Sequence, residues 1–131
     1  MQSAAENAQL YAQYSDYIQD KATQEAFTYF IGLLSVSVRY ICTPVLHGTY
    51  RDIKIHDLMN AKEQSFSLCA NQTFLNFYFR KPALTRNVYS VTDIEGLGFS
   101  VKAPANSNEE WTIRLISVSD VKKLWDYINC A

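Results

Sequence analysis

The chain has 131 residues, of which 48% are hydrophobic and 19% are charged. This composition excludes a disordered chain, and four glycines with three prolines exclude a low-complexity or collagen-like protein. Twelve basic and thirteen acidic residues give a net charge of −1, so the chain as a whole provides no field that attracts a nucleic acid backbone. We therefore expect a folded protein, and nucleic acid is not its expected partner.

A chain of this length fits one domain, which we predict to span residues 1–131. Its first residues lack the basic and apolar regions of a signal peptide, and no stretch approaches the roughly 18 apolar residues of a membrane span. Cys42, Cys69 and Cys130 are an odd set without CxxC spacing, which favours reduced thiols over disulfides or a zinc site. We predict a cytoplasmic protein without membrane contact, metal or other cofactor.

The N-terminal segment predicts a helix. Ser3 and Glu6 have the spacing of a capping box, in which each side chain satisfies a free backbone amide at a helix start. The apolar face that follows is rich in tyrosine, and we expect it to pack at the margin of the core or against a second copy of the chain. In the second case the homodimer face consists of Tyr11, Tyr14 and Tyr17.

The segment after Thr23 has an ambiguous period, because its apolar residues fit both helical spacing and strand alternation. The β-branched residues favour a helix over 23–34 and a strand over 36–42, and a single helix extending to residue 43 is the alternative. Pro44 ends either element. We expect residues 45–62 to be mostly irregular, with one short helical turn over 56–62.

The rest of the chain predicts an antiparallel sheet followed by a helix. Residues 66–70 and 73–80 form a hairpin, in which Phe77 and Tyr78 face opposite sides. Further strands are expected over 88–92, 97–102 and 111–118, with a polar turn over 104–108. Ser119 is placed to cap a final helix. The predicted fold class is α+β, with N-terminal helices packed on an antiparallel β-sheet that a C-terminal helix closes.

Over about residues 66–128, this order of elements resembles a family of small uncharacterised bacterial α+β domains, sometimes labelled predicted transport proteins. The matching features are the strand over 75–79, the strand over 111–115 and the start of the last helix at Ser119-Asp120-Val121. Between them, Gly96-Leu97-Gly98-Phe99 departs from the pattern of the family. The resemblance implies the fold, and it assigns no catalytic or binding residues.

Polar side chains that could recognise a ligand or partner gather between residues 46 and 58. Imidazole and carboxylate groups suit a transition metal or a hydrolytic site, but their spacing here matches no metal motif. Cysteine catalysis would need a thiolate beside a histidine, and no family signature surrounds the cysteines. We therefore expect a ligand or partner surface without a metal, formed by His47, Tyr50, Arg51, Asp52, His56 and Asp57.

Two other motifs suggest binding. The residues Gly96 to Phe99 spell the loop with which PDZ domains hold a peptide carboxylate, but too little chain follows for the rest of such a domain. The two glycines are instead expected to mark a tight approach to a strand. Arg80, Lys81 and Arg86 follow an aromatic run and could contact phosphates.

The function we prefer from the sequence is a non-enzymatic binding or accessory domain, bacterial or encoded by a mobile element, that acts through an aromatic-lined surface or pocket. Its expected partners are a second copy of the chain and an unidentified protein or small molecule. One alternative is a small hydrolase or nuclease centred on residues 47–57. Another is a nucleic-acid accessory factor that uses the cations at positions 80, 81 and 86.

Overall fold

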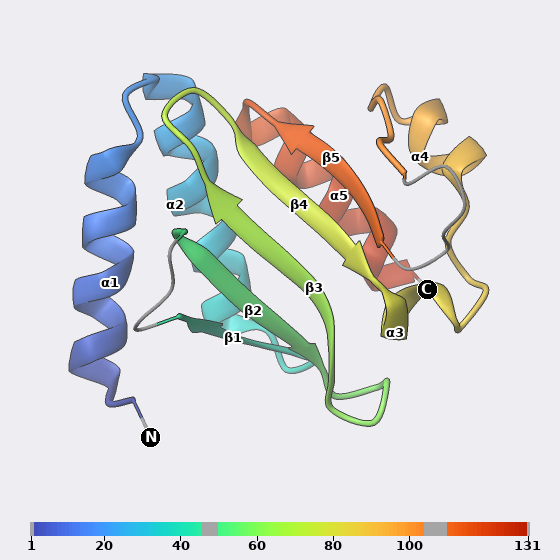
Figure 1. The fold of residues 1–131 in the computed structure, drawn as a ribbon, viewed down its shortest axis with the longest axis horizontal. Coiled ribbons are helices and arrows are strands. Elements are labelled where there is room, and N and C mark those ends of the chain that lie inside the picture. The colour runs from blue at the N-terminus through green and yellow to red at the C-terminus, as the bar shows by residue number, and fades with distance from the viewer. Residues whose placement is uncertain (1, 46–49, 104–109, 131) are drawn as a thin grey trace.

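The computed structural model describes residues 2–45, 50–103 and 110–130, and Figure 1 shows their arrangement. Five strands form one antiparallel sheet in which every strand pairs with its neighbour in the sequence. Two helices precede the sheet, two short ones lie between the last two strands, and one follows. The predicted α+β class and its layout are confirmed. The elements are α1 (Ala4–Tyr17), α2 (Lys21–Val36), β1 (Tyr40–Pro44), β2 (Asp52–Asp57), β3 (Glu63–Ala70), β4 (Leu75–Arg80), α3 (Lys81–Leu84), α4 (Val91–Gly96), β5 (Glu110–Leu115) and α5 (Val118–Cys130).

The core lies between one face of the sheet and the helices α2 and α5, which Figure 1 shows side by side. Strand alternation turns Phe66 of β3 and Phe77 of β4 toward these helices, where both are fully buried. Phe30 of α2 stacks on Phe77 with 5.8 Å between ring centroids. The hydroxyl of Tyr40 in β1 donates to the carbonyl of Ile128 in α5, so the last helix is tied to the first strand.

The tyrosine face of α1 packs against its own sheet. The predicted capping box is present at Ser3. The hydroxyl of Tyr14 donates to the carbonyl of Val45 at 2.9 Å, and the hydroxyl of Tyr11 lies 3.1 Å from the sulfur of Cys42. Packing at the margin of the core, one of the two predicted roles of this face, is thus observed. A homodimer through the same tyrosines stays a prediction. Its interface would have to compete with the contacts that Tyr11 and Tyr14 make within the chain.

The boundary between the second helix and the first strand lies later than predicted. Helix α2 continues to Val36, and Ser37, Val38 and Arg39 connect it to a strand that begins only at Tyr40. Val36 and Val38 are 80% and 93% exposed, so their strand-like alternation does not mark a strand. The alternative of a single helix to residue 43 is also wrong, because residues 40–44 pair with β2.

The prediction of an irregular segment over 45–62 is wrong for residues 52–57. Residues 52–57 form β2, which pairs with both β1 and β3, and residues 58–62 form a turn in place of the expected helical turn. Ala61 and Lys62 adopt positive φ angles of 56° and 59° there. The third inward-facing residue of β2, Asp57, is charged, so the apolar alternation of Ile53 and Ile55 does not extend over the whole strand.

The strands predicted over 88–92 and 97–102 are also wrong. Residues 91–96 form α4, which begins where the hydroxyl of Ser90 accepts the amide of Asp93 at 3.0 Å. Within 97–102 the described β structure is a single bridge from Lys102 to Thr112.

The last helix begins at Val118, capped by Ser117 and not by Ser119. The predicted turn over 104–108 lies outside the described residues. No helix in the described part of the chain is long and apolar enough to cross a membrane.

Candidate functional site

We call the face of the sheet opposite α2 and α5 the open face. The strand register places one residue of each strand in a row across it. A bridge beyond β5 extends the row by one residue from the segment after α4. Within the described residues, no helix covers this row (Figure 1). The row consists of Thr43, Lys54, Ser67, Tyr78, Thr112 and Lys102.

The open face is hollowed at its centre because β3 contributes small side chains there. Ser67 and Cys69 are only 6% and 5% exposed although they point away from the helices, since longer neighbours on β2 and β4 surround them. The resulting central hollow has a volume of about 500 Å³. Its walls include Lys54 on one side of β3 and Tyr78 on the other.

The central hollow presents both signs of charge and several hydrogen-bonding groups. Arg80 and Glu110 form an ion pair of 3.4 Å at one end, and the side-chain amide of Gln64 donates to the hydroxyl of Ser67 at 2.7 Å. The side-chain nitrogen of Asn71 is buried in the wall and has no hydrogen-bond partner among the described residues. An unpaired buried donor of this kind is unusual and suggests a group that a ligand would satisfy.

A second hollow of about 810 Å³ adjoins the first along the edge of the sheet. It lies between β5 and the segment 98–103, and we call it the edge groove. Asn76, Tyr78 and Glu110 line both hollows, so the two form one continuous surface.

The residues predicted between positions 46 and 58 do not form one site. Tyr50 and Asp52 line the central hollow. Arg51 turns to α1, where its guanidinium lies 3.7 Å from the centre of the Tyr17 ring. His56 and Asp57 are adjacent in β2 and therefore point to opposite faces of the sheet. His47 lies outside the described residues.

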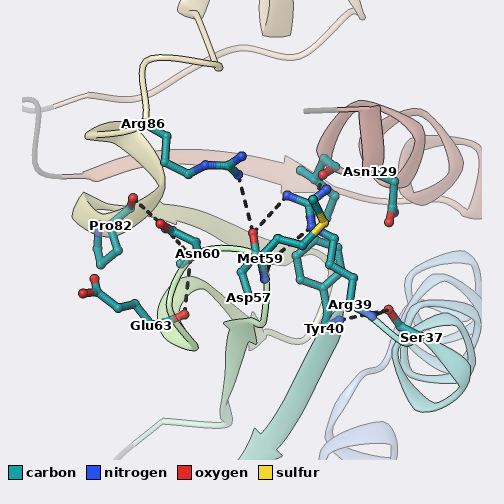
Figure 2. A network of polar contacts seen from close by, with 12 residues as sticks. Ser37, Arg39, Tyr40, Asp57, Met59, Asn60, Glu63, Pro82, Arg86 and Asn129 are labelled. Atoms are coloured by element: carbon teal, nitrogen blue, oxygen red, sulfur yellow. Dashed lines mark hydrogen bonds and ion pairs between the residues drawn. The ribbon is translucent and has the colours of Figure 1, made fainter.

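Asp57 is buried in an ion cluster that anchors the turn between β2 and β3 (Figure 2). Both of its carboxylate oxygens accept bonds of 3.0 Å from Arg39, and Arg86 lies 3.6 Å away on another side. The backbone amide of Met59 donates to the same carboxylate at 2.9 Å. The bond with Asp57 raises the pKa of Arg39. These contacts satisfy the charge of Asp57 within the fold, so it is a structural residue and not part of a ligand surface.

The cations at positions 80, 81 and 86 also fail to form one patch. Arg80 lies in the wall of the central hollow beside Glu110. Lys81 begins α3. Arg86 turns to Asp57, which lies on the helix-covered side. The predicted phosphate contacts are thus distributed over different surroundings.

The three cysteines occupy separate environments. Cys42 contacts Tyr11 on the helix-covered side, Cys69 forms part of the central hollow, and Cys130 is exposed on α5. Burial, followed by the charge of neighbouring Asp52, raises the pKa of the Cys69 thiol to about 11. This shift disfavours the thiolate that nucleophilic catalysis requires. In the described part of the chain, no three His, Cys, Asp or Glu side chains are arranged to hold a metal ion.

At pH 8 we expect iodoacetamide to modify Cys130 before the other two cysteines. The folded state holds the proton of Cys69 up to about pH 11, whereas an unfolded thiol loses it near its ordinary pKa of 9.0. The contribution of Cys69 to stability is therefore complete below pH 9 and is lost as the pH rises toward 11. Mass spectrometry of partly alkylated protein and urea unfolding of the Cys69→Ala variant between pH 7 and about 11 would check this. Equal modification rates for Cys69 and Cys130 would contradict it.

Gly96 to Phe99 form the end of α4 and the following turn, and not an approach to a strand. The amides of Leu97 and Gly98 donate to the carbonyls of Ile94 and Glu95 at 3.1 and 3.0 Å. Gly98 has a φ of 102°, which glycine adopts without the steric cost of a side chain. Since two of its amides are used within the helix end, this loop does not hold a carboxylate as a PDZ loop does.

Of the groups that line the two hollows, the sequence singled out Tyr50, Asp52 and Arg80 for binding, and it drew attention to Cys69, Gly98 and Phe99 for other reasons. The available signal was the alternation of β4, which placed Asn76 and Tyr78 opposite the core. Comparison with protein-family models, curated proteins and solved structures found no match to the chain. The resemblance of residues 66–128 to a bacterial α+β family therefore stays a prediction.

Proposed function

We propose that this chain is a non-enzymatic binding domain that holds a segment of another protein on the open face of its sheet. The observation that carries the proposal is the asymmetry of the sheet. One face is filled by apolar contacts with helices, whereas the other is hollowed above Ser67 and Cys69 and continues into a groove at the edge of β5.

The lining of the open face suits a polypeptide. Carboxamides such as Asn71 and Asn76 can bond both the N–H and the C=O groups of a peptide backbone. Tyrosine and arginine, which are enriched at protein interfaces, line the hollows at Tyr50, Tyr78 and Arg80. In the central hollow the acids Asp52 and Glu110 balance the cations Lys54 and Arg80, which suits a peptide better than a polyanion such as nucleic acid.

The placement of the titratable groups supports binding over hydrolysis. A general base or nucleophile needs a partner within hydrogen-bonding reach and a pKa suited to its task. Here His56 and Asp57 point to opposite faces, and the raised pKa of Cys69 keeps its thiol protonated. These observations support the non-enzymatic function over the hydrolase or nuclease alternative.

A selection from a random peptide library displayed on phage, with the folded chain as bait, tests the proposal. We expect enriched sequences whose affinity falls by about tenfold or more in Tyr78→Ala, because tyrosines at the centre of an interface often dominate binding. Tyr29→Ala is the matched control, since Tyr29 is another half-buried tyrosine but lies on α2. Enrichment no higher than on heat-unfolded chain, or equal losses in the two variants, would contradict the proposal.

A further inference from the structure

The sheet has an incomplete sixth position beside β5. Lys102 and Thr112 exchange two backbone hydrogen bonds of 2.9 and 2.8 Å, in the geometry of an antiparallel pair. If this pairing continued, Ser100 would lie opposite Arg114. Among the described residues, however, no backbone hydrogen bond joins 98–101 to 113–116. The two segments diverge after one pair, and the edge groove lies between them.

The divergence leaves backbone groups of β5 without a partner. In an antiparallel strand, the backbone N–H and C=O groups of successive residues point to opposite neighbouring strands. Thr112 directs its two groups away from β4, to Lys102. Arg114 therefore presents its N–H and C=O to the same side, where the described residues provide no backbone partner. Phe99 is buried in the core, which anchors the segment 98–101. The groove thus has the unpaired edge that an added strand requires.

The charges of the edge groove favour an acidic occupant. Its two cations, Lys102 and Arg114, are exposed, and Lys102 has no ion-pair partner among the described residues. The guanidinium of Arg114 lies 3.9 Å from the centre of the Phe74 ring, which holds it at the surface. Of the two acids in the lining, Glu110 pairs with Arg80, whereas Asp120 accepts the amide of Ile116 and keeps its charge. The two cations therefore outnumber the one acid that has no ion-pair partner among the described residues.

We infer that the edge groove is a strand-addition site for an extended acidic segment of another protein. The backbone of that segment pairs with Arg114, and carboxylates on its alternate residues face Lys102 and Arg114. An apolar residue packs against Ile116, which is 55% exposed at the end of the groove. This inference rests on the proposed function and specifies both the chemistry of the partner and the way it binds.

Two blocked hexapeptides test the inference, one in which Glu alternates with Val and one in which Lys replaces Glu. Calorimetry is expected to give about tenfold or greater preference for the Glu peptide. A copy of the Glu peptide with methylated central amides is expected to lose about tenfold in affinity, because it cannot complete the ladder. Binding is also expected to slow hydrogen exchange at the Arg114 amide, measured by NMR.

The double variant Lys102→Glu/Arg114→Glu is expected to reverse the preference toward the Lys peptide. Lys21→Glu/Lys123→Glu makes the same change of charge at exposed positions on α2 and α5 and is expected to leave the preference unchanged. If the first variant fails to fold, the difference in affinity between the methylated and unmethylated Glu peptides still tests the inference on the unaltered chain.

The inference would be overturned if the two peptides bound with equal affinity or if neither bound. It would also be overturned if hydrogen exchange at the Arg114 amide stayed unchanged on binding. A peptide from the library that depends on Tyr78 but leaves the exchange of the Arg114 amide unchanged would overturn strand addition while supporting the proposed function. A library without any binder to the open face would overturn both.

Discussion

Substitution of Asp57 by alanine is expected to lower the free energy of unfolding by about 3–5 kcal/mol, as for other buried ion pairs that lose one partner. Arg39 would remain buried with its guanidinium unpaired, and Arg86 would lose the charge that it faces. The amide of Met59 would also lose its acceptor, which loosens the turn between β2 and β3. Urea unfolding followed by circular dichroism measures the change.

Asp126→Ala is the control for this experiment, because Asp126 is an exposed aspartate on α5. Its effect is expected to stay within about 0.5 kcal/mol. A double variant, Arg39→Met/Asp57→Leu, is expected to be more stable than Asp57→Ala, since apolar groups of similar size often replace a buried pair at little cost. A loss below about 1 kcal/mol in Asp57→Ala would show that the cluster does not anchor the turn.

Substitution of Phe66 by alanine is expected to cost about 3–5 kcal/mol, the range for large aromatic side chains in well-packed cores. The ring of Phe66 is fully buried and lies 5.2 Å from Phe77 and 5.8 Å from Tyr40, measured between ring centroids. These neighbours come from β4 and β1, so the cavity would open between three strands. Thermal unfolding and urea unfolding both report the loss.

Val38→Ala is the matched control on the connection between α2 and β1. Since Val38 is 93% exposed, its truncation is expected to change stability by no more than about 0.5 kcal/mol. If Val38→Ala and Phe66→Ala lost a comparable free energy of unfolding, the connection between α2 and β1 would have to pack against an apolar surface. A loss below about 2 kcal/mol in Phe66→Ala would contradict the assignment of this ring to the centre of the core.

The sequence predicts the elements that follow one period and fails where a local signal competes with it. The alternation from Leu75 to Arg80 is regular, and β4 has the predicted faces. In β2, Asp57 occupies a core position because Arg39 neutralises it, and no local pattern reveals a partner 18 residues away. In 88–92 the β-branched residues conceal a helix start, although Ser90 and Asp93 have capping spacing.

The candidate site is less predictable than the fold because it depends on the register of strands. Ser67 and Cys69 look like ordinary strand residues in the sequence. They form the floor of a hollow only because Lys54 and Tyr78 stand beside Ser67 on neighbouring strands. The edge groove depends on where the pairing of Lys102 with Thr112 stops, which no spacing along the chain encodes.

The order of the strands has a consequence for the protein while it is being synthesised. Because each strand pairs with its predecessor, the sheet can grow one strand at a time as the chain leaves the ribosome. Helix α2 is made early, but its partner α5 is translated after every strand, and Phe30 of α2 meets Trp125 of α5 only then. A nascent chain that lacks α5 therefore has an apolar sheet face that α2 covers only in part. The exposed part of this face favours aggregation, or capture by a chaperone, until α5 is made.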